Sequence, residues 1–464
     1  MKNFPAPARF VGIAALCLAA THASASDAAP ESAVDLAQHG ADPAWSIVED
    51  LTTEIGPRMA GTEAEAAARR WAIARLQALG FANVREEQFD LPVWVRGEEQ
   101  AWLTGPFQPQ KLAVTALGNS ASTGSKGIEG DIAYFESFDA LAGASDAKVK
   151  GKIVFIDNQM KAAQDGSGYG YYGRGRFTGP NVAAKKGAIA IVIRSIGTDA
   201  HRNPHTGVTN FDPGVKPIPA GAISNPDADQ LARQWKRAVA VTQPEPLHMK
   251  LVLTPQNLGT KHSGNVIAEV PGSDPAASPI IVACHLDSWD LGTGAIDDAA
   301  GCGIITAAAG HVMKAATPRR TIRILWAGAE EVGVFGGKAY FETHGKEKHA
   351  AALESDFGAD RVWRIDFKLP DSAKPVADRI AAAVMPFGVV RGKQPAGGGA
   401  DIGALVQAGV PAIDLQQDGT RYFDVHHTPD DTLDKIDPMQ LRQNVTVWAA
   451  TLAILANSTD DELP

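Results

Sequence analysis

Residues 278–287 read SPIIVACHLD and contain the pattern that decides the fold. The first six of them form a continuous apolar run, which is typical of a strand buried on both faces. A second such run, TIRILWA at residues 321–327, follows after a helical pattern over residues 303–314. A strand, a helix and a second strand in this order predict a βαβ unit, whose two strands lie parallel in one sheet.

The same alternation of apolar strands and helical patterns continues over residues 248–460. We therefore predict an α/β domain with a mostly parallel central sheet flanked by helices. Residues 42–109 add a helical pattern, with a capping box at Thr62 and Glu65, followed by strand-like segments. We assign these residues to the same domain as its first part.

Residues 110–247 differ in texture and are predicted to form a smaller, inserted domain. Short β-branched runs at residues 151–157 and 188–193 are separated by glycine-rich loops such as residues 166–175. The segment 201–219 is rich in proline and glycine, which predicts a long ordered loop.

Residues 1–25 are predicted to be a signal peptide. Lys2 and Arg9 supply basic charge, residues 10–20 are apolar, and small residues at 23–25 fit a cleavage site. The apolar run is too short to span the roughly 30 Å hydrocarbon core of a bilayer. We expect an exported protein, periplasmic or secreted, with no membrane span in the mature chain.

Charge and cysteine content narrow the function classes. The net charge of −10 over 464 residues, with no block of like charges, argues against nucleic acid as a partner. Cys284 and Cys302 are the cysteines beyond the predicted leader. They are able to pair in an oxidising compartment, but two cysteines are not a disulfide framework, and buried free thiols fit the sequence equally well.

Polar residues able to bind metal follow the first predicted strand. His285 comes after it, and Asp287 is a carboxylate able to orient the imidazole ring. Asp297 and Asp298 lie among small residues just before the helical pattern. Each also has an ordinary explanation: His285 as a polar loop residue, and the two aspartates as caps of a helix N-terminus.

Further candidates follow later strands. Glu330 and Glu331 come after the run at residues 321–327. Either both are exposed on a surface loop, or the two carboxylates have separate roles in an active site. In the second case Glu331 binds metal and Glu330 acts as general base towards a water molecule. Asp356 follows another apolar stretch, and His426 and His427 belong to the segment YFDVHHTPDDT, where a polar turn is the ordinary explanation.

Considered as a set, these residues favour a metal site. Two imidazoles and three carboxylates all stand at strand ends or in the following loops, where ligands collect in open α/β sheets. Nitrogen and oxygen donors in this mixture suit zinc, with cobalt or manganese as substitutes. The predicted metal ligands are His285, Asp297, Glu331, Asp356 and His427.

The ordered motifs HLDSWD, DDAAG, AEE, ESD and HHTPDDT resemble the bacterial leucyl aminopeptidase-like family of co-catalytic zinc exopeptidases, and within it the carboxypeptidase Q subgroup. The resemblance covers nearly all of the chain beyond the leader. It implies a zinc exopeptidase-like fold, a protease-associated domain as the insert, and two zinc ions per chain. The implied ligand sets are His285, Asp297 and Asp356 for one ion, and Asp297, Glu331 and His427 for the other.

The resemblance also implies individual roles. It assigns Glu330 as the general base. Asp287, which the residue pattern predicts to orient the imidazole ring of His285, is the second predicted catalytic residue. The resemblance selects His427 over His426, because the ligand directly precedes Thr428 in the family pattern. It further implies a cis peptide bond after the bridging Asp297.

The predicted function is hydrolysis of dipeptides or short peptides by a metal-activated water molecule. A broad aminopeptidase on the same site stays open, because the ligand spacing does not say which end of a peptide is recognised. Two other classes are a non-catalytic binding protein of the same fold and a two-metal enzyme acting on a different bond. The resemblance also suggests a homodimer.

Overall fold

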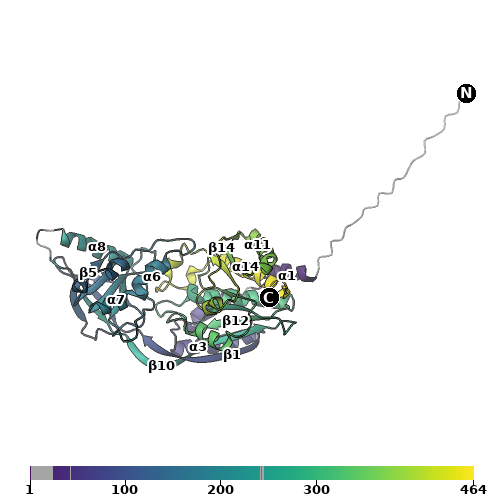
Figure 1. Cartoon of the computed structure of the whole chain (residues 1–464), viewed down its shortest axis with the longest axis horizontal. Coiled ribbons are helices and arrows are strands. Elements are labelled where there is room, and N and C mark those ends of the chain that lie inside the picture. The colour runs from purple at the N-terminus through teal and green to yellow at the C-terminus, as the bar shows by residue number, and fades with distance from the viewer. Residues whose placement is uncertain (2–24, 42, 241, 243–244, 464) are drawn as a thin grey trace.

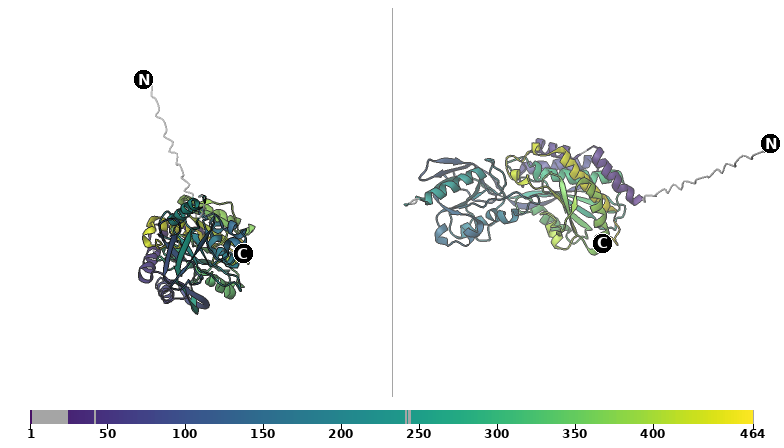
Figure 2. Two further views of the ribbon diagram at one scale, coloured as in Figure 1. Left: turned by 90° about the vertical axis from the view of Figure 1, so that its left-hand side faces the viewer. Right: turned by 90° about the horizontal axis from the view of Figure 1, so that it is seen from above.

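The computed structural model describes residues 1, 25–41, 43–240, 242 and 245–463. The predicted signal peptide therefore lies outside the described residues, apart from its first and last positions. The protein consists of two lobes that lie side by side along its longest axis, each with its own eight-stranded sheet (Figure 1, Figure 2). No helix within the described ranges is long and apolar enough to cross a membrane.

The larger lobe contains a sheet whose four central strands run parallel. The neighbouring strand on each side is antiparallel to them, and the two outermost pairs are antiparallel at one edge and parallel at the other. This arrangement confirms the predicted α/β class with a parallel central sheet. In spatial order the strands are β1 (Ala82–Val95), β10 (Gln256–Val270), β12 (Ile322–Ala327), β11 (Ile280–His285), β13 (Ala351–Glu354), β16 (Ala412–Gln417), β14 (Val362–Lys368) and β15 (Val390–Arg391).

Helices cover both faces of this sheet, as the βαβ pattern predicts. On β11, Ile280 and Val282 pack with helices of one face, whereas Ile281 and Ala283 pack with α10 and α12 on the other. Every residue of β11 is buried, which confirms a strand covered on both sides. The helices are α1 (Ala25–His39), α2 (Pro43–Asp50), α3 (Glu63–Ala78), α9 (Ala300–Ala315), α10 (Phe335–His344), α11 (Lys374–Val384), α12 (Gly403–Gln407), α13 (Tyr422–Val425) and α14 (Pro438–Asn457).

The smaller lobe also has a parallel centre, formed by β5, β6, β7 and β8. Its strands, in spatial order, are β3 (Gln110–Leu112), β2 (Glu99–Thr104), β9 (His248–Leu253), β5 (Ile128–Phe135), β6 (Ile153–Ile156), β7 (Ala190–Arg194), β8 (Ala220–Ile223) and β4 (Val114–Ala116). Its helices are α4 (Phe138–Ala142), α5 (Asp146–Val149), α6 (Tyr169–Phe177), α7 (Gly179–Lys185) and α8 (Asn225–Val239). The strand β2 lies within residues 42–109, which the sequence pattern assigns to the larger domain.

A long antiparallel ribbon of β1 and β10 joins the two lobes (Figure 1). The first seven residues of β10 are exposed and the remaining eight are buried, so the ribbon extends out of the larger lobe. Directly beyond its far end, β1 continues to β2 and β9 leads into β10. The chain therefore enters and leaves the smaller sheet through this one pair of strands.

The composition predicts that the glycine-rich segment 166–175 is a loop, but only its first residues are. The helix α6 begins at Tyr169 and includes the rest of the segment. Tertiary contacts outweigh the low helix propensity of its glycines. The ring of Tyr169 stacks on that of Phe423 in the larger lobe, with centroids 4.8 Å apart. The segment 201–219, by contrast, contains no helix or named strand and is the ordered loop that was predicted.

Cys284 and Cys302 form a disulfide bond, which settles the question that the sequence left open. Cys284 lies in β11 next to His285, and Cys302 lies in the first turn of α9. The bond therefore attaches α9 to the central strand directly beside the end of the sheet where His285 is placed.

Replacing both cysteines by alanine should lower the free energy of unfolding by roughly 3 kcal/mol, because the bond closes a short loop and restricts the unfolded chain. Alanine avoids burying a new polar group in this apolar region. Thermal and denaturant unfolding of the variant and the wild type would measure the difference. An unchanged midpoint under oxidising conditions would contradict a stabilising role for the bond.

Candidate metal centre

All five predicted ligands lie at the carboxyl-terminal edge of the parallel strands. His285 ends β11, Glu331 follows β12 and Asp356 follows β13. Asp297 belongs to the turn that precedes α9, and His427 follows α13. Parallel strands end at one edge of a sheet, so residues far apart in the sequence meet there.

One group of donors forms around His285, whose side chain is completely buried. Its Nε2 atom lies 3.0 Å from Asp297 Oδ1 and 3.4 Å from Asp356 Oδ1. The other ring nitrogen, Nδ1, lies 3.0 Å from the backbone oxygen of Asp287. Because Nδ1 donates to that carbonyl, Nε2 is the nitrogen that is available to a metal ion.

A second group forms around His427. Its Nε2 atom lies 3.3 Å from Asp297 Oδ2 and 3.0 Å from Glu331 Oε2. Its Nδ1 atom lies 3.2 Å from the backbone oxygen of Thr206, which belongs to the smaller lobe. Asp297 therefore presents one carboxylate oxygen to each group of donors.

His426 is a further neighbour of this second group. Its Nε2 atom lies 3.5 Å from Asp297 Oδ2, and its ring stacks on that of His427. His427 approaches both Asp297 and Glu331, whereas the ion-pair contact of His426 is to Asp297 alone among the described residues. This geometry favours His427 as the ligand, in agreement with the sequence pattern.

The donors have the properties that a divalent cation requires. Asp297 Oδ2 and Asp356 Oδ1 are buried, and neither accepts a hydrogen bond from any described residue. Burial raises the pKa values of Glu330 and Glu331 well above their ordinary range, and nearby carboxylates such as Asp356 and Asp297 add to the effect. Bound cations would relieve this repulsion, so the nitrogen and oxygen donors present fit zinc.

Asp287 has a different contact from the one expected. Its carboxylate lies 3.8 Å from His285 Nδ1, which is longer than a hydrogen bond, and the ring is oriented by the backbone oxygen instead. The carboxylate of Asp287 accepts hydrogen bonds from the backbone N–H groups of Glu330, at 3.0 Å, and Glu331, at 3.3 Å. Asp287 thus positions the segment that carries the predicted base and one predicted ligand.

Arg58 is an important residue that sequence reasoning missed. Its guanidinium group is fully buried and donates to the backbone oxygens of Leu286, Thr293 and Gly294, at 2.5, 2.6 and 2.9 Å. It therefore holds the segment that directly follows β11 to the segment that leads into the Asp297 turn. Burial lowers the pKa of Arg58, and nearby carboxylates led by Asp431 oppose that shift. Backbone acceptors have no signature in a sequence, which is why no pattern marks this arginine.

Two other aspartates fix the backbone around Asp297. Asp431 accepts hydrogen bonds from the N–H groups of Ala295 and Ile296 at 2.8 and 2.7 Å, and burial together with Asp297 raises its pKa to about 7. Asp298 accepts from the N–H groups of His285 and Gly301, both at 3.0 Å. The peptide bond between Asp297 and Asp298 is cis, as the resemblance implied.

Both lobes line a cleft of about 520 Å³ over the two groups of donors. Glu330 and Asp356 line it from the larger lobe, and Tyr169, Arg176 and Phe177 line it from the smaller one. This is the cavity in which a substrate would meet the candidate metal ligands.

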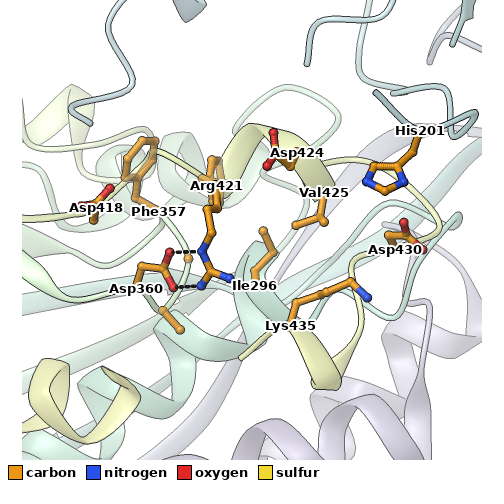
Figure 3. Close-up of a pocket in the computed structure, with 13 residues that line it drawn as sticks. His201, Ile296, Phe357, Asp360, Asp418, Arg421, Asp424, Val425, Asp430 and Lys435 are labelled. Atoms are coloured by element: carbon orange, nitrogen blue, oxygen red, sulfur yellow. Dashed lines mark hydrogen bonds and ion pairs between the residues drawn. The ribbon is translucent and has the colours of Figure 1, made fainter. Parts of the chain in front are cut away.

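A separate cavity of about 270 Å³ contains none of the predicted ligands (Figure 3). Arg421 and Asp360 form a two-pronged ion pair in its wall, at 3.0 and 2.5 Å. Four of the five predicted ligands line the cleft, and none of them lines this cavity.

Comparison with known proteins agrees with this geometry. Residues 265–452 match the model of peptidase family M28. The chain is 32% identical over 417 residues to carboxypeptidase Q of Mus musculus, covering 89% of this chain and 85% of that protein. The chain belongs to peptidase family M28. It is accordingly a peptidase, similar to carboxypeptidase Q.

Solved structures of relatives show the same fold. The crystal structure of a peptidase M28 precursor from Shewanella amazonensis is 46% identical, with a TM-score of 0.88 over 93% of this chain and 96% of that one. A zinc aminopeptidase from Bacillus subtilis is 19% identical, with a TM-score of 0.63 over 91% and 97% of the two chains. The second likeness is one of fold alone.

Replacing Asp287 by asparagine should lower peptidase kcat/KM by about 10–100-fold, because one of the two backbone N–H groups then faces an amide NH₂ group instead of an acceptor. Steady-state kinetics and zinc content would be measured beside Asp434→Asn, a control at an exposed carboxylate. Activity equal to that of the wild type would mean that the carboxylate of Asp287 does not position the Glu330 segment.

Proposed function

We propose that this protein is a dizinc exopeptidase that hydrolyses dipeptides or short peptides, with Glu330 as the general base. The observation that carries the proposal is the placement of Asp297 between two groups of donors. One oxygen faces His285 and Asp356, and the other faces His427 and Glu331. The relative from Bacillus subtilis is a zinc aminopeptidase, which supports the choice of metal.

The residues of the chain divide the chemical work. His285, Asp297 and Asp356 would hold one zinc ion, and Asp297, Glu331 and His427 the other. Zinc, when bound, supplies Lewis acidity towards the scissile carbonyl and the attacking water.

Glu330 would perform the proton transfers. Its carboxylate lines the cleft, so it is placed to accept a proton from a water molecule as the oxygen of that water forms a bond to the carbonyl carbon. The same carboxyl group then donates the proton to the leaving nitrogen when the C–N bond breaks. Asp287 keeps Glu330 in place through the backbone during both transfers.

The alternative from the sequence, a broad aminopeptidase, uses the same metal site. Relatives of both kinds occur, since the chain is similar both to carboxypeptidase Q and to aminopeptidase YwaD of Bacillus subtilis. The choice depends on which charged end of the peptide the cleft recognises, and not on the metal ligands.

Replacing Glu330 by glutamine should lower kcat by roughly 10²–10⁴-fold, because the amide cannot accept the proton. Free dipeptides, N-blocked dipeptides and aminoacyl-anilides would serve as substrates, with zinc content measured by atomic absorption. We expect close to two zinc ions per chain in this variant, and fewer in the matched variant Glu331→Gln. Undiminished hydrolysis by Glu330→Gln would sink the assignment of the base, and a single retained ion in the wild type would exclude the dizinc site.

A further inference from the structure

Arg176 is a buried charged residue in the wall of the catalytic cleft. It belongs to α6 of the smaller lobe and is only 2% exposed. Its Nη1 atom donates to the backbone oxygen of Thr206 at 3.2 Å, and its Nη2 atom donates to the hydroxyl of Tyr169 at 2.6 Å. Its Nε–H group has no hydrogen-bond partner among the described residues. The guanidinium group therefore retains donor capacity that the protein does not use.

The charge of Arg176 also lacks a partner. No carboxylate of the described residues lies within ion-pair distance of it, whereas the buried guanidinium groups of Arg194 and Arg320 are paired with Asp157 and Asp460. The buried guanidinium group of Arg58 likewise has no ion pair within the described ranges, but its Nε, Nη1 and Nη2 atoms all donate to backbone oxygens, whereas Nε of Arg176 donates to none. An unpaired buried charge is costly, and a ligand of opposite charge would offset that cost at Arg176. The ligand expected here is an anion that enters the cleft.

The guanidinium group has a fixed position. Its central carbon lies 4.4 Å from the ring centroid of Phe177. The backbone of Gly207, at φ +139°, is also close, because an added Cβ atom there would come within 2.4 Å of that carbon. The position of Arg176 is thus confined by an aromatic ring and by bare backbone, so its planar guanidinium group needs little rearrangement to bind a carboxylate.

Arg176 is close to the candidate metal site. Its Nη1 atom lies 3.3 Å from Nδ1 of His427, and both nitrogens approach the same carbonyl oxygen, that of Thr206. The Nε2 atom of His427 faces the metal ligands, so one imidazole ring separates the guanidinium group from them. In a dipeptide the terminal carboxylate follows the scissile carbonyl by one residue, about 3.3–3.6 Å of extended chain.

The other charges in the cleft favour the same end of the peptide. The carboxylates that line it are Asp297, Glu330, Glu331 and Asp356, all of which have roles in the proposed function. None of the lining carboxylates is therefore left over to bind a free amino group. Apart from these carboxylates and the histidines, the cleft is lined by two charged side chains, Arg176 and Lys338, and both are cationic.

We propose that Arg176 binds the free α-carboxylate of the substrate, so that the enzyme recognises the C-terminal end of dipeptides and short peptides. This inference rests on the proposed function and specifies its substrate. An α-carboxylate would accept two parallel hydrogen bonds from the guanidinium fork and neutralise its charge.

The test compares a dipeptide with its C-terminal amide, which differs only in the charge that Arg176 would bind. In the wild type we expect kcat/KM for the free acid to exceed that for the amide by about 100-fold or more, as for close charge pairs removed from water. In Arg176→Gln this ratio should fall towards one, through loss of activity on the acid while activity on the amide persists. Arg176→Lys, which keeps the charge but not the fork, should give an intermediate ratio.

Arg174→Gln is the matched control, because Arg174 lies on the same helix but is exposed and paired with Asp139. It should leave the ratio unchanged. A wild-type ratio near one, or an equal loss on both substrates in Arg176→Gln, would overturn the assignment and leave Arg176 as a support for His427. The proposed function would still stand after either result if the wild type hydrolyses the acid or the amide and binds two zinc ions. Failure of the Arg176 assignment can therefore be distinguished from failure of the proposed function.

Discussion

The burial of many carboxylates at one edge of the central sheet is the constraint on which the rest of the structure depends. Removing charged groups from water is costly unless each finds a partner. The protein meets this cost in two ways. Asp287, Asp298 and Asp431 accept hydrogen bonds from backbone N–H groups of the surrounding turns. Asp297 and Asp356 instead keep buried oxygens without such donors, and these oxygens are available to cations.

The two kinds of carboxylate depend on each other. The backbone-bound aspartates shape the turns, and the turns direct the remaining side chains into two groups of donors. Arg58 adds a positive charge beneath the same turns and satisfies three of their carbonyl oxygens. A site of this kind is preorganised, because its ligands are held by the fold and need little rearrangement when a metal ion binds.

Much of the fold and of the candidate site could be predicted from the sequence. The strands β11 and β12 are strongly apolar, and chemically distinctive residues such as His285 and Glu331 stand directly at their ends. A buried strand and its terminal side chains are local features, so one sequence is enough to recognise them. The parallel arrangement then brings those ends together without further information.

Other parts could not be predicted, for physical reasons. Arg58 donates to backbone oxygens, and such acceptors are present at every residue. Arg176 contacts Thr206 and His427, which are far from it in the sequence. The helix α6 forms from a glycine-rich stretch because Tyr169 packs on the other lobe, a contact that no local pattern reveals. The disulfide bond between Cys284 and Cys302 required knowledge of how α9 lies on β11.

The hydrogen bonds between the lobes limit how the inserted domain can change during evolution. The backbone N–H of Thr206 donates to the carbonyl oxygen of His427, and the ring of His205 donates to that of His426. A candidate ligand of the larger lobe is thus held in place by a loop of the smaller one. The two lobes are therefore expected to evolve together. If the inserted domain were exchanged between relatives, its loop would have to fit residues 422–431 of the larger lobe. Recombination at the β1–β10 ribbon is simple in terms of chain connectivity, but the loop and the segment that it holds must change together.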